Sequence, residues 1–199
     1  MKQKLIILDR DGVINYDSDN YIKSPEEWKP LPGSINAIAT LTQIGYTIAI
    51  ATNQSGLARK YFTLETLTAM HKKMLNLITT AGGKINHIAY CPHGPNDQCN
   101  CRKPKPGLVE KISQNLNIPI TTETFFVGDS ISDLNAALNS GCTPVLVKTG
   151  KGLKSFVKLK QPENSHLKGI AVYNSLSDFV NTLVTPSNPK ATVKNPLNR

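Results

Sequence analysis

The sequence predicts an α/β fold with a doubly wound, Rossmann-like and mostly parallel sheet covered by helices on both faces. Short apolar runs alternate with segments of helical periodicity along most of the chain, which is typical of parallel strands joined by right-handed crossovers. The first run, residues 5–8, is aliphatic at every position, as in a strand buried on both faces. No segment between the elements exceeds a loop, so we expect no separate cap domain.

Each predicted strand is a short apolar run, and the strands comprise residues 5–8, 47–52, 85–90, 124–127 and 145–148. Each predicted helix repeats apolar residues at helical spacing, and the helices comprise residues 33–44, 63–82, 106–116 and 131–139. Gly45 ends the first helix, Thr63 caps the second, and Pro106 suits the first turn of the third. A last strand–helix pair is predicted at about residues 170–184.

The length of 199 residues predicts one domain with a substantial core, which we place at residues 1–184. Residues 185–199 contain three prolines among small polar residues and are predicted to be a flexible tail. The chain shows no secretory signal and no run of roughly 18 apolar residues. We therefore expect a cytoplasmic protein that has no membrane partner, and we expect a monomer.

The net charge of +9 is concentrated at one end of the chain. Residues 148–199 hold nine basic and two acidic residues, which gives +7, whereas residues 1–147 hold 14 basic and 12 acidic residues, which gives +2. A chain this basic suggests nucleic acid as a partner. However, the lysines of residues 148–168 lack interleaved aromatic residues apart from Phe156, which favours a solvated face or an anion-attracting rim. We therefore predict no nucleic-acid partner.

Two aspartates, Asp9 and Asp11, follow the first predicted strand. A strand buried on both faces excludes carboxylates, so they are expected just past its carboxyl end, the edge at which open α/β sheets bind ligands. Two carboxylates there can bind Mg²⁺, and one can attack phosphorus to form an aspartyl-phosphate. Taken alone, the motif is equally typical of an Asp-Gly turn.

Three further groups of polar residues lie next to the ends of predicted strands and helices. Hydroxyls and backbone N–H groups can cradle a phosphate in the run Thr52, Asn53, Gln54 and Ser55. Asp129 follows the fourth strand and can complete a Mg²⁺ site, while Lys103, just before a helix, can supply a fixed positive charge. Each signal alone is typical of a turn or of the surface. Together, in the order nucleophile, hydroxyl, lysine and acid, they favour phosphoryl transfer.

A loop rich in proline and glycine holds a second cluster of chemically active residues. Three thiols and one imidazole match the tetrahedral ligand set of a structural Zn²⁺, and they are Cys91, His93, Cys99 and Cys101. The alternative is a loop with unrelated thiols and a surface histidine. Because four protein ligands leave no open position, we predict that the zinc stiffens the loop that carries Arg102 and Lys103.

The four motifs resemble, in their order, those of the haloacid dehalogenase superfamily of phosphotransferases. The resemblance implies that Asp9 is the nucleophile, and that Asp11 protonates the leaving oxygen and then activates water. It implies that Mg²⁺ is held by the Asp9 carboxylate, the Asp11 backbone carbonyl and Asp129. It also implies that Thr52 and Lys103 bind the phosphoryl oxygens, which agrees with catalysis by positioning and charge neutralisation.

The motifs and the cysteine loop together are similar to a narrow lidless group of that superfamily. The group contains D-glycero-D-manno-heptose 1,7-bisphosphate 7-phosphatases and histidinol-phosphate phosphatases. Ser55 is closer to the heptose enzymes, because the histidinol group usually has aspartate there. The resemblance implies a Mg²⁺-dependent enzyme that removes the 7-phosphate of the sugar bisphosphate, in the biosynthesis of nucleotide-activated heptose for surface polysaccharide.

Residues 15–21 are similar to the substrate loop of the heptose enzymes. The resemblance implies substrate contacts from Asp17, Asp19, Asn20 and Tyr21. Arg102 is a candidate to hold a phosphate or sugar hydroxyls, because a guanidinium is a fixed fork of donors. Ser130 departs from the group, since many relatives have Lys or Arg after the motif acid.

Three other interpretations remain at this point. A histidinol-phosphate phosphatase is disfavoured by the polar loop at residues 15–21 and by Ser55. A nucleic-acid 3′-phosphatase is favoured by the net charge and the Thr-Asn-Gln motif, but the excess charge lies in the last quarter of the chain. A zinc-stiffened binding module with an inactive phosphatase fold is disfavoured by the intact motif residues.

Overall fold

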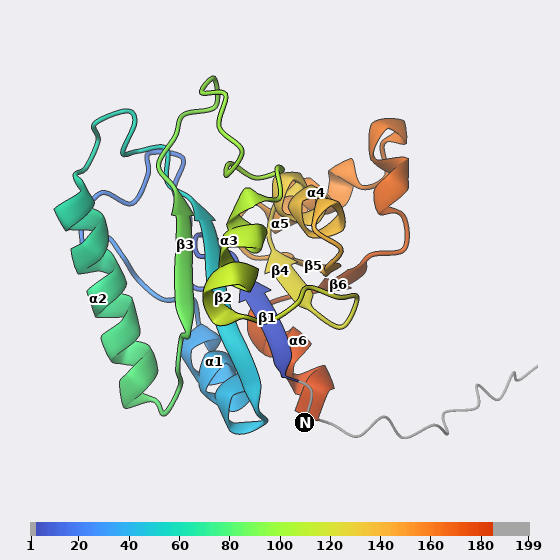
Figure 1. Ribbon diagram of the computed structural model, residues 1–199, viewed down its shortest axis with the longest axis horizontal. Coiled ribbons are helices and arrows are strands. Elements are labelled where there is room, and N and C mark those ends of the chain that lie inside the picture. The colour runs from blue at the N-terminus through green and yellow to red at the C-terminus, as the bar shows by residue number, and fades with distance from the viewer. Residues whose placement is uncertain (1–2, 185–199) are drawn as a thin grey trace, which may run out of the picture.

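The computed structural model describes residues 3–184 and confirms the predicted α/β fold. Its six strands are all parallel and follow the order β3-β2-β1-β4-β5-β6 (Figure 1). They are β1 (Lys4–Leu8), β2 (Tyr46–Asn53), β3 (His87–Cys91), β4 (Phe125–Gly128), β5 (Thr143–Val147) and β6 (Ala171–Tyr173). The order reverses between β1 and β4, so the sheet is doubly wound and has its ligand-binding switch point there.

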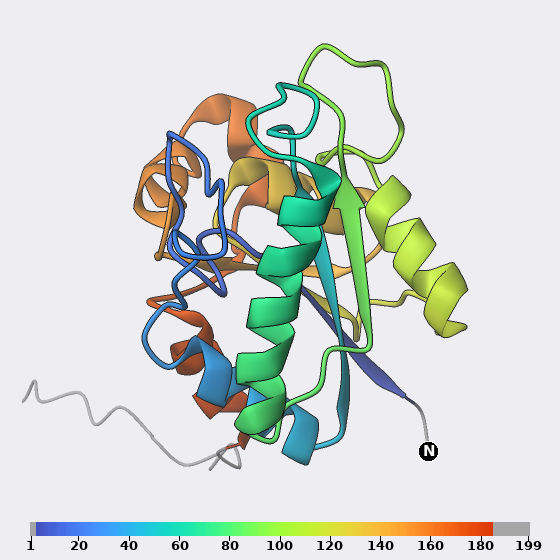
Figure 2. The ribbon, with the colours of Figure 1, turned by 90° about the vertical axis from the view of Figure 1, so that its left-hand side faces the viewer.

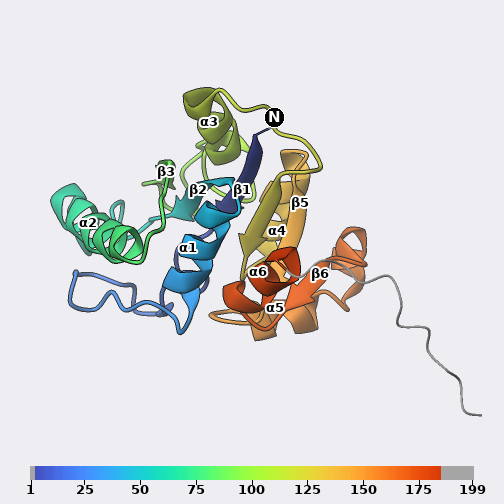
Figure 3. The ribbon, with the colours of Figure 1, turned by 90° about the horizontal axis from the view of Figure 1, so that it is seen from below.

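Helices cover both faces of this sheet. They are α1 (Ser34–Gln43), α2 (Leu64–Thr80), α3 (Gly107–Leu116), α4 (Ile131–Asn139), α5 (Gly152–Lys158) and α6 (Leu176–Val184), with a 3₁₀ helix η1 (Pro162–Leu167). One buried cluster joins α1, α2 and α6 to the sheet, and a second joins α3 and α4 to the opposite face. Figure 3 shows α1 and α6 on the face opposite α3.

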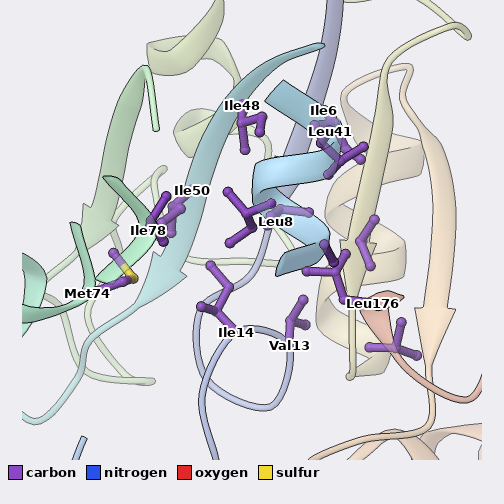
Figure 4. Close-up of a cluster of buried hydrophobic side chains, with 14 of the residues drawn as sticks. Ile6, Leu8, Val13, Ile14, Leu41, Ile48, Ile50, Met74, Ile78 and Leu176 are labelled. Atoms are coloured by element: carbon purple, nitrogen blue, oxygen red, sulfur yellow. The ribbon is translucent and has the colours of Figure 1, made fainter. Parts of the chain in front are cut away.

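The central strand β1 explains why its sequence is apolar at every position. Ile6 and Leu8 belong to the cluster beneath α1 (Figure 4), while Leu5 and Ile7 belong to the cluster beneath α3. Alternate side chains of one strand point to opposite faces, so each face takes two of the four. Burying these four side chains contributes about 1.5–3 kcal/mol each, which fixes where the chain must leave the sheet.

Residues 148–168, for which the sequence analysis predicts a solvated face or an anion-attracting rim but assigns no helix, contain α5 and η1. Phe156 and Leu167 pack with Leu146 of β5, but most of the α5 positions are exposed. A short helix with so few buried side chains gives a weak periodic signal, and for that reason the sequence did not indicate it.

Loops follow β1, β2 and β3 at the carboxyl edge of the sheet (Figure 2). Within the described range, residues 9–33, 54–63 and 92–106 contain no helix or multi-residue strand, and the first of these loops has two isolated bridges. Among the helices at residues 3–184, none is long and apolar enough to cross a membrane. The predicted tail at residues 185–199 lies outside the described residues.

Candidate active site

A cavity of about 360 Å³ opens at the carboxyl edge of the sheet, beside the switch point. Twelve residues predicted for the site line it: Asp9, Asp11, Asp17, Asp19, Tyr21, Thr52, Asn53, Gln54, Ser55, Arg102, Lys103 and Asp129. Asn20, predicted for the substrate loop, is exposed and lies beside a neighbouring surface hollow instead. The structure therefore brings residues from four separate chain segments around one cavity.

Asp9 forms the centre of a buried charge cluster. The Nζ atom of Lys103 lies 2.8 Å from Asp9 Oδ1 and 2.6 Å from Asp133 Oδ1, and donates a hydrogen bond to the Ala51 carbonyl at 2.8 Å. Burial raises the pKa of Asp9 to about 7, and the Asp133 carboxylate adds to the rise while Lys103 opposes it. Burial alone would lower the pKa of Lys103, but the two carboxylates outweigh it and raise that pKa.

Asp129 stands against the turn that follows β1. A side chain on either Gly12 or Gly150 would overlap the Asp129 carboxylate, and both glycines have positive φ, at 81° and 55°. Burial and the carboxylates of Asp133 and Asp9 raise the pKa of Asp129 to about 8. Carboxylate oxygens of Asp9, Asp129 and Asp133 lie within 4.8 Å of one another. Because Lys103 balances only one of three buried negative charges, this oxygen set fits a divalent cation such as Mg²⁺.

The Asp11 carboxylate pairs with the side chain of Arg10, a residue that the sequence analysis did not single out. The Arg10 guanidinium is almost fully buried and lies 2.9 Å from Asp11 Oδ1, while Asn15 and Gln54 also donate hydrogen bonds to the carboxylate. Burial alone would raise the pKa of Asp11, but Arg10 and these hydrogen bonds outweigh it and lower the pKa. An arginine between two polar residues gives no burial signal in the sequence, which is why it was missed.

The loop after β2 is tied to the loop before α3. Asn53 Oδ1 accepts from the Lys103 backbone N–H at 3.1 Å, and Asn53 Nδ2 donates to the Lys103 carbonyl at 3.2 Å. Gln54 Nε2 donates to Thr52 Oγ1 at 2.8 Å, which fixes the hydroxyl beside the cavity. This paired hydrogen bonding explains how a surface loop holds Lys103 at the buried cluster.

The four predicted zinc ligands lie together in the loop after β3. Their side-chain donor atoms are all within 4.8 Å of one another, with Cys91 Sγ 3.2 Å from Cys101 Sγ and 3.7 Å from Cys99 Sγ. His93 Nδ1 lies 3.2 Å from Cys101 Sγ. Tetrahedral zinc–sulfur bonds of about 2.3 Å place neighbouring ligand atoms roughly 3.5–3.8 Å apart. The observed separations of 3.2 to 3.7 Å are close to this range, so the four residues fit a Zn²⁺ site.

The mouth of the cavity carries a lysine that the sequence analysis missed. Lys151 Nζ lies 3.1 Å from Asp17 Oδ2 and 3.7 Å from Asp19 Oδ1. Its position directly after the turn that follows β5 was a usable signal, because side chains at that edge meet the site. Tyr21 adopts φ 65° in the loop and packs edge-on against Tyr61, with ring centroids 5.0 Å apart.

Ser130, the departure noted in the sequence, has a local structural role. Its hydroxyl accepts from the Asp133 backbone N–H, and the Asp133 carboxylate accepts from the Ser130 backbone N–H at 3.0 Å. This reciprocal capping box starts α4. It also holds Asp133 in place beside Lys103.

Comparisons with known proteins agree with this geometry. The family described as polynucleotide kinase 3 phosphatase matches residues 4–151. A solved D,D-heptose 1,7-bisphosphate phosphatase from B. bronchiseptica, complexed with magnesium and phosphate, has a TM-score of 0.84 and 47% identity over 92% of this chain and 98% of its own. A had-like phosphatase structure from Mesorhizobium loti has a TM-score of 0.67 and 31% identity over 74% of this chain and 73% of its own.

Fold, cavity and matches together define a phosphatase of the haloacid dehalogenase superfamily. A D-glycero-beta-D-manno-heptose-1,7-bisphosphate 7-phosphatase from Pseudomonas putida is 57% identical over 78% of this chain and 88% of its own length. One from Neisseria meningitidis serogroup A is 53% identical over 88% and 92%. The chain belongs to this heptose-bisphosphate phosphatase family.

Proposed function

We propose that the protein is a Mg²⁺-dependent phosphatase that removes the 7-phosphate of D-glycero-beta-D-manno-heptose 1,7-bisphosphate through an aspartyl-phosphate. The observation that carries the proposal is the buried cluster of Asp9, Lys103 and Asp133 at the cavity. The proposal also rests on 57% identity to a D-glycero-beta-D-manno-heptose-1,7-bisphosphate 7-phosphatase. Its reaction supplies the monophosphate for the later steps toward nucleotide-activated heptose.

Asp9 is the proposed nucleophile, since its carboxylate faces the cavity and is oriented by Lys103 and by the Arg10 backbone N–H at 2.7 Å. Lys103 and Thr52 neutralise and bind the oxygens of the transferring phosphoryl group. Bound Mg²⁺, held by Asp9, Asp129 and the Asp11 backbone carbonyl, supplies charge neutralisation as the phosphoryl group moves. Asp9 and Asp129 belong to the acid cluster that fits a divalent cation, which supports their part in this assignment, and the Asp11 carbonyl is assigned from the family resemblance.

Asp11 is the proposed proton carrier. In the first step it protonates the leaving alkoxide, and in the second it takes a proton from the water that attacks the aspartyl-phosphate. The Arg10 guanidinium favours the ionised base required for the second step. A phosphate dianion bound beside Asp11 favours the protonated acid required for the first step, and transfer of that proton to the leaving alkoxide leaves the base required for the second.

We also propose that the Cys₃His cluster holds a structural Zn²⁺. Arg102 supports this role, because its Nη1 donates to the His93 carbonyl at 3.2 Å, so the ordered loop orients the guanidinium that lines the cavity. Three clustered thiols serve as metal ligands in a reducing compartment, which supports a cytoplasmic enzyme. The monomeric state stays a prediction.

A second candidate is a nucleic-acid 3′-phosphatase, which the family description favours. The acidic residues at the mouth of the cavity, Asp17 and Asp19, oppose it, because Lys151 balances only one of their two negative charges and a continuous phosphate backbone would be repelled. The test is phosphate release from the heptose bisphosphate, histidinol phosphate and a 3′-phosphorylated oligonucleotide. We expect kcat/KM to be highest for the sugar bisphosphate by at least about a hundredfold, and preference for either other substrate would reject the proposal.

A further inference from the structure

Lys151 lines the cavity but belongs to none of the four phosphatase motifs identified in the sequence. It stands just before α5, and its side chain is 50% exposed at the mouth of the cavity that contains Asp9. Its ammonium group pairs with the carboxylates of Asp17 and Asp19. The lysine therefore lies between the reacting centre and the loop that is proposed to bind the sugar.

The backbone of Lys151 is fixed to the reacting centre. Its N–H donates to Asp129 Oδ2 at 2.7 Å, and the Ser155 hydroxyl donates to the Asp129 carbonyl at 2.8 Å. Thr149 Oγ1 donates to the Gly12 carbonyl at 2.6 Å, which links the same turn to the segment after β1. These anchors do not involve the ammonium group, whose own partners Asp17 and Asp19 lie at the open mouth of the cavity, where a ligand can compete with them.

The other basic side chains that line the cavity differ from Lys151 in how far they are free to bind a ligand. Among the residues that line it in the described chain, Arg10 is engaged by Asp11 and Lys103 by Asp9 and Asp133. Both of these cations are almost completely buried. Arg102 and Lys151 remain as the partly exposed cations that line the cavity, so a ligand phosphate that binds them breaks no buried ion pair.

We propose that Lys151 binds the phosphate of the sugar bisphosphate that is not hydrolysed, together with Arg102; this inference rests on the proposed function. A phosphate monoester carries about −1.5 to −2 charges at neutral pH and accepts charge-assisted hydrogen bonds from an ammonium group. Asp17 and Asp19 would repel such a group at the mouth. Lys151 offsets that repulsion and makes the site selective for a substrate with two phosphates.

The test compares heptose 1,7-bisphosphate with heptose 7-phosphate, which shares the sugar and the reacting phosphate but lacks the distal one. Lys151→Met removes the charge and keeps the backbone N–H on Asp129. We expect KM for the bisphosphate to rise about tenfold to a hundredfold, with kcat within about twofold and a much smaller change for the 7-phosphate. Lys151→Arg restores most of the bisphosphate affinity, and Lys154→Met, an exposed lysine of α5, serves as the control.

Two results would overturn the inference while leaving the proposed function intact. Equal KM increases on both substrates would mean that Lys151 only positions the loop at residues 15–21, and an unchanged KM would mean that it has no role in binding. Thermal unfolding of Lys151→Met and direct binding of the bisphosphate to the Asp9→Asn, Lys151→Met double variant separate misfolding from lost affinity. If the wild-type protein itself hydrolyses neither heptose phosphate, the proposed function fails and the inference with it.

Discussion

Asp9 and Asp11 lie one residue apart, yet their surroundings push their pKa values in opposite directions. Burial and neighbouring carboxylates raise the pKa of Asp9 to about 7, whereas Arg10 and hydrogen bonds lower that of Asp11 against the effect of burial. Carboxylates with such different environments are suited to different tasks in one reaction. The proposed roles of Asp9 as nucleophile and Asp11 as proton carrier are therefore consistent with contacts that the protein itself provides.

Asp9→Asn and Asp11→Asn should each lower kcat by at least about a thousandfold, because one removes the nucleophile and the other the proton carrier. Both replacements are close to isosteric, so the circular dichroism spectrum should match that of the wild type. Phosphate release at saturating substrate checks the rates. Asp97→Asn, in the cysteine loop and away from the cavity lining, serves as the control. Activity above a few per cent in Asp9→Asn would contradict the aspartyl-phosphate mechanism.

His71 supplies a prediction about pH. Its Nε2 lies 3.4 Å from Arg10 Nη1, and burial together with that guanidinium lowers the pKa of His71 to about 4. Between about pH 4 and pH 6.5, His71 is protonated in the unfolded chain but neutral in the folded chain. The contribution of His71 to the free energy of unfolding therefore falls as the pH falls through that window. His71→Gln should flatten this dependence, measured by urea unfolding at pH 4.5, 5.5 and 7.

His166→Gln, at an exposed histidine away from the cavity lining, serves as the matched control. A His71→Gln protein that loses stability toward low pH as steeply as the wild type would show that other groups cause the dependence. The neutral state of the imidazole beside Arg10 would then lose its support.

At the scale of elements, the cysteine loop connects the proposed zinc site to the cavity. It runs from the end of β3 to the start of α3 and presents Arg102 and Lys103 to the cavity. Cys99→Ser should release the zinc, loosen the loop and lower activity, because both cations then lose their fixed position. Elemental analysis of protein purified without added metal should give one zinc per chain.

Cys142→Ser is the control for this prediction, because that thiol is buried in the α3–α4 cluster outside the cysteine loop. The variant should keep its zinc. Wild-type protein that is free of zinc and fully active would reject the structural metal site.

The sheet and most helices could be predicted because aliphatic runs and helical periodicity record burial directly. The motif residues could be predicted because they follow strands whose apolar runs end abruptly, as at Asp9 and Asp129. The burial of Arg10 could not be predicted, since it depends on Gln54 and His71 from distant parts of the chain. Lys151 was missed although its position after β5 was a usable signal, because its partners Asp17 and Asp19 lie far away in the sequence. Asn20 shows the converse: adjacency to Asp19 in the sequence did not place its side chain at the cavity.

At the scale of the whole molecule, charge and topology act together. The sheet order places the ends of β1 and β4 side by side, so two acidic motifs more than 100 residues apart share one cavity. The α5 segment then brings part of the basic last quarter of the chain to the mouth of that cavity through Lys151. One of these basic residues thus has a proposed role at an anionic substrate, and that role requires no nucleic acid.

The regiochemistry of hydrolysis tests the central claim most directly. Phosphorus NMR of heptose 1,7-bisphosphate at partial conversion, with Mg²⁺ present, distinguishes the phosphate on C7 from the phosphate on C1. We predict loss of the C7 signal with an equal gain of inorganic phosphate, while the C1 signal persists, and no change with Asp9→Asn. Loss of the C1 signal, or an intact bisphosphate under conditions in which histidinol phosphate is hydrolysed, would contradict the account.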